Sequence, residues 1–169
     1  MPSNRATLFA RLEDLGIVSS TVEHAPLYTV EQSQALRGTI PGAHTKNLFL
    51  KDKDGRMALV VAKLVVAKED TKVDLKRLAK QLGLGRFSFG KPALMMAVLG
   101  IEPGSVTAFA LVNETSQELA AVVVDEALMD FAEVNCHPLV NSATTRLATR
   151  DLLRFMEACG HQPRILRLD

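Results

Sequence analysis

Two apolar runs separated by a short polar turn constrain the fold of this chain most. The runs are Leu48–Leu50 and Met57–Ala62, and the turn between them is Asp52-Lys53-Asp54-Gly55. Aspartate and glycine favour a tight turn here, because glycine takes positive φ without steric cost. The pattern therefore predicts a β-hairpin. Alternation predicts two faces for its first strand: Leu48 and Leu50 on one, and Asn47, Phe49 and Lys51 on the other.

Lys46 lies where the first strand of this hairpin begins, just after the helix- and strand-breaking pair Pro41-Gly42. A lysine on rigid backbone near the margin of a sheet is well placed to contact a ligand. The same place suits a lysine that only solubilises the surface. Position alone leaves both interpretations open.

The rest of the chain predicts short strands mixed with about five helices, without regular βαβ alternation. Helices are expected to begin near Ser3 or Asn4, at Thr29, at Thr71 or Asp74, at Pro92 and at Thr149. Further strands are expected within 17–23, 85–89, 121–125, 133–136, 144–148 and 165–168, while 106–112 fits either a strand or a helix. This pattern indicates an α/β domain with a mixed, largely antiparallel sheet.

The length and composition fit one soluble globular domain spanning residues 1–169. Of the 169 residues, 47% are hydrophobic and 23% charged, and no apolar run is long enough to span a bilayer. The N-terminus lacks the apolar core of a signal peptide, so we expect a cytoplasmic protein without a membrane partner. The two cysteines, Cys136 and Cys159, fit reduced thiols better than a disulfide framework.

Charge is distributed unevenly, although the net charge is only +1. Residues 46–91 hold twelve lysines and arginines against five acidic residues, whereas the remainder holds eight against fourteen. Such asymmetry indicates an anionic partner. The alternative for the cations of the expected helix, Lys72, Lys76, Arg77 and Lys80, is that they only solvate its exposed face.

Common catalytic motifs are absent from the sequence. It contains no G-x-S-x-G, HExxH, Walker lysine loop or GxGxxG. Cys136 and His137 are adjacent, and adjacent side chains on a strand point to opposite faces, so they do not form a nucleophile–base pair. The four histidines are scattered without ligand spacing. We therefore expect neither a metal nor a cofactor.

Four segments together resemble a known family. They are Gly38–Asp52 (GTIPGAHTKNLFLKD), Leu84–Phe89 (LGRFSF), Gly100–Thr107 (GIEPGSVT), and Cys136–Asn141 (CHPLVN) with Thr144 and Thr145 after it. In this order, and over nearly the whole chain, they resemble the YbaK/prolyl-tRNA-synthetase-associated domain family. Within it the chain is most similar to freestanding prolyl-tRNA editing proteins of the ProX type, which deacylate alanine mischarged onto proline tRNA. Ala108, where the family commonly has proline, and the variable pair Asn135-Cys136 are departures that could alter the shape of the pocket.

The resemblance implies a fold and a set of functional residues. The fold is a mixed sheet curled into a partial barrel with helices around it. Lys46 is implied as the functional lysine, with Asn47 holding the terminal adenosine and ester, partly through its backbone. The residues implied around the aminoacyl pocket are His137, Thr45, Gly100 and Pro103; those implied on the tRNA acceptor stem are Lys51 and Arg86. The helix at Thr29–Leu36 corresponds to a mobile cover, although the residues alone also fit a fixed connector.

The implied chemistry does not require a Ser/His/Asp catalytic triad. An aminoacyl ester is already activated, so its hydrolysis needs a placed water and stabilised developing charge rather than a covalent nucleophile. A proline-specific synthetase cannot strongly exclude alanine, because losing a few methylenes yields only ~1–3 kcal/mol of discrimination. A second site that admits alanine but is too small for proline completes a double sieve. A small, partly apolar pocket surrounded by basic residues is therefore expected.

Alternatives to Ala-tRNA(Pro) deacylation remain open at this level. Cys-tRNA(Pro) or another small aminoacyl-tRNA would suit the same machinery. A noncatalytic module that binds tRNA or a synthetase would keep the fold without turnover. The expected partners are the acceptor end of mischarged tRNA(Pro) and, transiently, prolyl-tRNA synthetase or an elongation factor.

Overall fold

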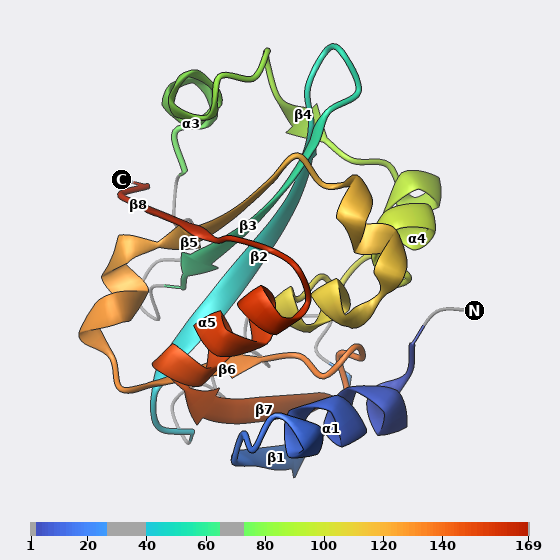
Figure 1. Ribbon diagram of the computed structural model, residues 1–169, viewed down its shortest axis with the longest axis vertical. Helices are drawn as coiled ribbons and strands as arrows, with labels where there is room; N and C mark the ends of the chain where they lie inside the picture. The colour runs from blue at the N-terminus through green and yellow to red at the C-terminus, as the bar shows by residue number, and fades with distance from the viewer. Residues whose placement is uncertain (1–2, 27–39, 65–72, 169) are drawn as a thin grey trace.

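The computed structural model describes residues 3–26, 40–64 and 73–168, and Figure 1 shows their arrangement. The α-helices are α1 (Arg5–Asp14), α3 (Leu75–Leu82), α4 (Pro92–Leu99) and α5 (Thr149–Ala158). The strands are β1 (Ser19–Glu23), β2 (Ala43–Lys51), β3 (Met57–Lys63), β4 (Ser88–Phe89), β5 (Ala121–Asp125), β6 (Glu133–Cys136), β7 (Ala143–Ala148) and β8 (Arg164–Leu166). Three 3₁₀ helices are η1 (Ala108–Val112), η2 (Glu114–Glu118) and η3 (Glu126–Asp130). The helix expected at Thr29–Leu36 lies outside the described residues.

The eight strands form one mixed sheet in the order β1-β7-β6-β2-β3-β5-β8, with β4 paired to β2 beside this path. Four of its seven strand pairings are antiparallel and three are parallel. The predicted fold class is thus confirmed. The described strands do not close into a barrel, because β1 and β8 remain the ends of the order.

The long strand β2 connects the two halves of the sheet. β3 pairs with it along one side, in the predicted hairpin from Thr45 opposite Lys63 to Lys51 opposite Met57. On the other side, β6 pairs in parallel with its first residues and β4 pairs with its last. The start of β2 therefore lies beside β6, whereas its end lies beside β4.

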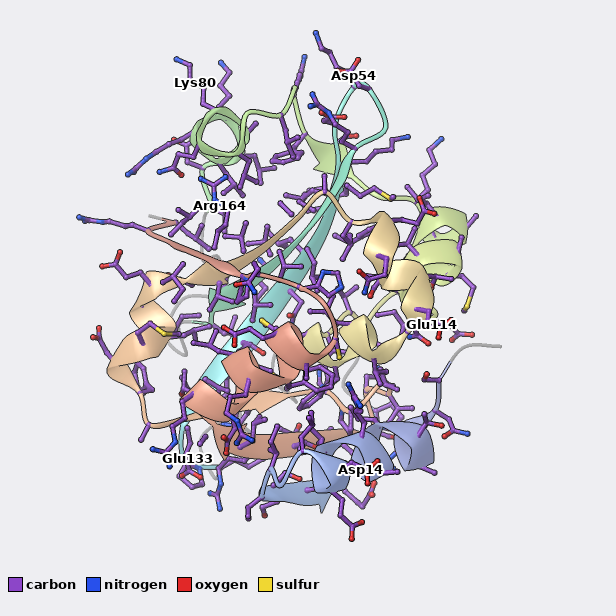
Figure 2. The ribbon with its side chains drawn as sticks, in the orientation of Figure 1. Asp14, Asp54, Lys80, Glu114, Glu133 and Arg164 are labelled. Atoms are coloured by element: carbon purple, nitrogen blue, oxygen red, sulfur yellow. The ribbon has the colours of Figure 1, made fainter. Side chains whose placement is uncertain are left out.

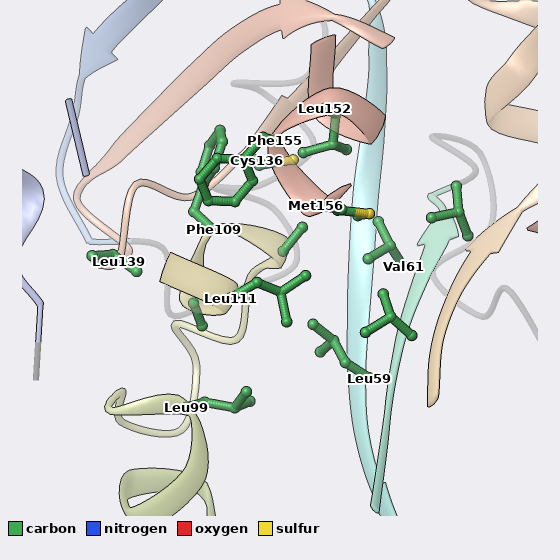
Figure 3. Packing of buried hydrophobic residues seen from close by; sticks show 14 of the residues in the cluster. Leu59, Val61, Leu99, Phe109, Leu111, Cys136, Leu139, Leu152, Phe155 and Met156 are labelled. Carbon is green, nitrogen blue, oxygen red and sulfur yellow. The ribbon is translucent and has the colours of Figure 1, made fainter. Parts of the chain in front are cut away.

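Both faces of the hairpin are covered by apolar residues. Phe49, Leu59 and Val61 belong to a first cluster, which also contains Phe155 and Met156 of α5 (Figure 3). A second cluster on the opposite face has the following members: Leu50, Ala58, Val60, Ala62, Leu78, Ala79, Phe87, Val123 and Leu168. Since complete burial of a large apolar side chain contributes about 1.5–3 kcal/mol, both clusters fix the hairpin in register. The predicted facing of Leu50 and Phe49 is confirmed.

Most helix termini follow the capping residues in the sequence. The Asn4 side chain accepts a hydrogen bond from the Thr7 N–H, and Asp74 caps α3 in the same way. Thr149 was expected to cap α5, and this is wrong. Ala148 occupies the cap position, and the Thr149 hydroxyl donates to the Phe131 carbonyl at 2.6 Å instead. No helix within the described ranges is long and apolar enough to cross a membrane.

The Asp52 carboxylate organises the hairpin turn. It accepts backbone hydrogen bonds from Asp54 at 2.9 Å, Arg56 at 2.8 Å and Gly85 at 3.0 Å. Burial would raise the pKa of Asp52, but these hydrogen bonds and the charge of Arg56 outweigh it, so its pKa lies below the ordinary value. Because Gly85 precedes β4, this one side chain ties the segment after α3 to the hairpin.

Candidate functional site

The two faces of the sheet half formed by β1, β7, β6 and β2 differ in polarity. The face toward the first cluster carries Ala43, Val134, Cys136 and Leu147. Because side chains alternate along a strand, the intervening residues lie on the opposite face. We call this opposite face the polar face; its polar and charged members include His24 and His137, which directly follow β1 and β6, and His44, Lys46, Glu133, Asn135, Thr144 and Arg146. A partly buried polar surface on a sheet otherwise covered by apolar groups is a candidate functional site.

Lys46 lies on the polar face, partly buried, opposite Ala62 of β3. Among the residues that the structure describes, no hydrogen bond or ion pair engages its ammonium group. A partly buried cation without a carboxylate partner is available to an anionic ligand, such as a phosphate or a developing oxyanion.

The hydrogen bond of His137 defines its tautomer. Nδ1 lies 3.2 Å from the Ala143 carbonyl oxygen, which can only accept, so Nδ1 carries the proton. Burial lowers the pKa of His137 below its ordinary value and nearby His24 lowers it further, although the Ala143 hydrogen bond acts in the opposite direction. The ring is therefore neutral at pH 7, and Nε2 presents a lone pair that can accept a proton or a hydrogen bond.

The loop after His137 is held in an uncommon conformation. Leu139 has φ +70°, which non-glycine residues rarely adopt, and its N–H donates to the His137 carbonyl at 2.9 Å. The Leu139 side chain is buried in the first cluster and anchors the loop there. Packing thus imposes the tight turn that follows the histidine.

His24 is a second histidine at this place, and the sequence reasoning did not identify it. Its Nδ1 donates to the Ala25 carbonyl at 2.8 Å, so Nε2 accepts from the Thr144 hydroxyl at 2.9 Å. Its backbone N–H donates to Ser142 at 3.0 Å. Antiparallel pairing of β1 with β7 brings His24 beside the His137 loop. No spacing in the sequence reveals this pairing, because the two strands are more than 100 residues apart.

Asn47 and Thr45 alternate to the face opposite Lys46. The Thr45 hydroxyl donates to the Asn135 backbone carbonyl at 2.8 Å, and the Asn47 Nδ2 lies 3.5 Å from the Thr45 hydroxyl. Within the described part of the chain, the Asn47 Oδ1 is buried without a hydrogen-bond partner. The structure therefore does not bring these two side chains together with Lys46, and on the polar face these positions can offer only backbone groups.

Asn135 fastens the start of β2. Its side-chain amide donates to the Pro41 carbonyl at 2.9 Å and to the Ala43 carbonyl at 3.1 Å. Gly42 lies between them with φ +93°, and a Cβ there would come within 3.1 Å of the Asn135 amide nitrogen and the Glu133 carbonyl. This contact sets the position of the backbone that leads to Lys46.

The remaining expected site residues lie in two other places. Gly100 ends α4 with φ 66°, and Pro103 lies in the turn closed by the Ser105 N–H donating to the Glu102 carbonyl at 3.1 Å. Next to this turn, a Cβ on Gly104 would meet the amide of Asn141, so the turn borders the loop that follows His137. By contrast, Lys51 and Arg86 flank the β2–β4 pairing at the other end of the hairpin. Five residues of strand separate Lys51 from Lys46, which is about 17 Å.

The site offers no thiolate and no metal cluster among the described residues. Burial raises the pKa of the Cys136 thiol to about 12, while a hydrogen bond from Thr45 acts in the opposite direction. In the three described ranges, no group of three or more histidine, cysteine or acidic side chains could hold a metal ion. The chemistry that these residues can supply is an ammonium charge, a neutral imidazole and backbone hydrogen bonds.

The chain is similar to known proteins over most of its length. Residues 24–155 match the family model of the aminoacyl-tRNA editing domain. The chain is 33% identical over 164 residues to the prolyl-tRNA editing protein ProX of Acetoanaerobium sticklandii, covering 97% of each protein. It is 37% identical over 169 residues to prolyl-tRNA synthetase associated domain-containing protein 1 of Bos taurus, covering 98% of this chain and 95% of that protein.

A solved structure has the same fold. It is that of a candidate trans-editing enzyme for prolyl tRNA synthetase, with a TM-score of 0.68 and 20% sequence identity. The match covers 98% of this chain and 97% of the other. Lys46, Asn47 and His137 all fall within the part of the chain that matches the family model.

Proposed function

The chain belongs to the aminoacyl-tRNA editing domain family, and from this we propose that it is a trans-editing deacylase that hydrolyses the ester of Ala-tRNA(Pro). The observation that carries the proposal is the polar face, where Lys46, without a carboxylate partner among the described residues, lies on the same side of the sheet as neutral His137. The ProX relative supports proline tRNA as the carrier.

We assign the roles on this face by charge and protonation. Lys46 binds a phosphate of the terminal adenosine or the oxygen that becomes negative when water attacks the ester carbonyl. His137 Nε2 accepts a hydrogen bond or a proton from the attacking water, and the vicinal hydroxyl of the terminal ribose assists proton transfer to the departing ribose oxygen. The products are alanine and the free tRNA end.

The other site residues have supporting roles in this proposal. The backbone of Asn47 and Thr45 lines the ester, since their side chains alternate to the other face. Gly100 and Pro103 close the aminoacyl end, and the size of that end excludes proline. Lys51, about 17 Å along β2 from Lys46, and Arg86, which precedes β4, contact the acceptor stem.

A deacylation panel tests the proposal. Purified protein in excess over substrate is incubated with alanyl, cysteinyl, seryl and prolyl esters of tRNA(Pro), and ester loss is followed over time. We expect rapid loss of the alanyl ester and persistence of the prolyl ester. If the alanyl ester survives, the assignment is wrong. Cleavage of the cysteinyl ester alone would then identify another small aminoacyl substrate. Binding of tRNA without hydrolysis of any ester would identify a noncatalytic module.

A further inference from the structure

A groove of about 950 Å³ lies between α3 and the segment leading into β4, and no member of the polar face lines it. Four cations line it, three on α3 and one on the opposite wall: Lys76, Arg77, Lys80 and Arg86. None of the described residues that line it carries a negative charge. Lys80 projects outward from α3 (Figure 2). This groove has the charge of a site for an anionic partner.

The apolar floor of the groove does not require an apolar ligand. Ala79 and Phe87 form part of it, and both are buried members of the second cluster. Lysine and arginine side chains commonly lay their aliphatic stems over such a surface and keep the charged heads in water. The floor therefore supports the cations, and the exposed rim is what meets a partner.

The groove and Lys46 lie on the same side of the hairpin. Lys46 is opposite Ala62 of the second cluster, and α3 packs against that cluster through Leu78 and Ala79. A ligand held at Lys46 can therefore extend along this side of the sheet toward α3. A tRNA bound by its 3′ end is an extended anion whose acceptor arm continues from the reacting ester.

We propose that the α3 groove binds phosphates of the acceptor arm of the tRNA, with Lys76 and Lys80 as the principal contacts. This inference rests on the proposed function and extends it from the reacting end to the body of the substrate. Lysine–phosphate contacts of this kind supply affinity without reading sequence, so the groove raises the affinity for tRNA and leaves the chemical step unchanged.

The test compares two pairs of substitutions that remove equal charge. Lys76→Gln/Lys80→Gln removes two cations from the groove; glutamine has nearly the helix propensity of lysine, so α3 remains folded. Lys91→Gln/Arg150→Gln removes two exposed cations outside the groove. Binding of uncharged tRNA(Pro) is measured by fluorescence anisotropy between 50 and 200 mM salt, and this readout does not depend on turnover.

We expect the groove variant to bind more weakly at low salt and to be less sensitive to salt. The logarithm of the binding constant falls with the logarithm of the salt concentration, with a slope of ~0.9 per phosphate contact. Losing two contacts therefore makes the fall in affinity between 50 and 200 mM salt about tenfold smaller. In deacylation, KM for whole Ala-tRNA(Pro) should rise while kcat stays constant, and an alanylated CCA trinucleotide should react at the wild-type rate. In the control pair, the salt dependence of binding, KM and kcat should change only as much as the loss of two positive charges anywhere on the surface would change them.

Two outcomes overturn the inference. One is a salt dependence of the groove variant equal to that of the control pair. The other is unchanged tRNA binding with lost binding of prolyl-tRNA synthetase, which makes the groove a protein-docking surface. A wild-type protein that binds tRNA through the groove but hydrolyses no ester refutes the proposed function and leaves the groove as an RNA site.

Discussion

Replacing His137 tests the chemistry of the polar face at a single atom. His137→Asn places an amide N–H where Nδ1–H stands, so the hydrogen bond to the Ala143 carbonyl, 3.2 Å in the structure, can be kept. The same substitution removes Nε2 and its lone pair. His137→Gln instead extends an amide toward the place of Nε2, where its oxygen accepts a hydrogen bond but is not basic. The two variants therefore separate anchoring, hydrogen bonding and proton transfer.

The expected size of the effect follows from the role assigned to Nε2. A positioned general base contributes typically ~10²–10⁴-fold, or about 3–5 kcal/mol of transition-state stabilisation. If Nε2 takes a proton, both variants lose this much in kcat. If it only accepts a hydrogen bond, His137→Gln keeps most of the activity and His137→Asn does not.

The pH dependence has a definite sign. Protonation of Nε2 removes the lone pair, and the pKa of His137 lies below its ordinary value of 6.5, so wild-type activity should be flat above pH 6.5 and fall on the acid side of it. The unfolded chain takes up this proton at higher pH than the folded chain does, so stability also declines as pH falls below 6.5. Circular dichroism at each pH keeps the two effects apart.

Single-turnover deacylation of Ala-tRNA(Pro) from pH 5 to pH 8 is the assay. A His137→Asn variant that stays folded and reacts within about threefold of wild type would refute the catalytic assignment of this histidine. An acid limb that persists unchanged in both variants would show that another group titrates.

Two further predictions concern the structure that holds the site. Asn135→Asp should destabilise the fold by about 3 kcal/mol or more, and Asn135→Ala by about 2 kcal/mol. Both substitutions leave the carbonyls of Pro41 and Ala43 without a donor, and the aspartate also adds a buried charge. Thermal melts in which Asn135→Ala is the less stable variant would contradict this. Asp52→Asn should lower Tm at pH 7, since an amide cannot accept all the N–H groups, including that of Gly85, that the carboxylate accepts. The pKa of Asp52 is lowered, so its carboxylate stabilises the fold above its ordinary pKa of 3.8, and this stabilisation is lost as pH falls below that value. A difference in Tm between wild type and Asp52→Asn that is equal at pH 7 and pH 3 would count against this reasoning.

Local signals in the sequence predicted much of the fold. The hairpin around Asp52–Gly55, the Asn4 and Asp74 caps and the strand at Ala121–Asp125 all depend on neighbouring residues, and the structure confirms them. The segment 106–112 was ambiguous because its short apolar run has no clear period, and it contains the 3₁₀ helix η1. The pairing partners could not be read from the sequence, since the parallel contact of β2 with β6 joins residues 91 positions apart, such as Ala43 and Val134.

The site could be predicted only in part for the same reason. Lys46 and His137 were named from a resemblance, and strand alternation together with the β2–β6 pairing places them on one face. Strand alternation places the side chains of Cys136 and His137 on opposite faces, and the same rule places those of Lys46 and Asn47 on opposite faces, so the sequence predicts both separations. His24 was not, because its place depends on the long-range pairing of β1 with β7.

The most direct test of the deacylase assignment is the single-turnover rate of Lys46→Ala on Ala-tRNA(Pro), with Lys91→Ala as a matched loss of an exposed lysine. We expect a loss of about 10²–10³-fold for Lys46→Ala with an unchanged melting temperature, because charge stabilisation at the ester is removed while the core is untouched. Lys46→Arg should recover part of the rate if the charge mainly anchors a phosphate, and little if a compact ammonium must meet the oxyanion. A Lys46→Ala rate equal to that of Lys91→Ala would remove Lys46 from the mechanism.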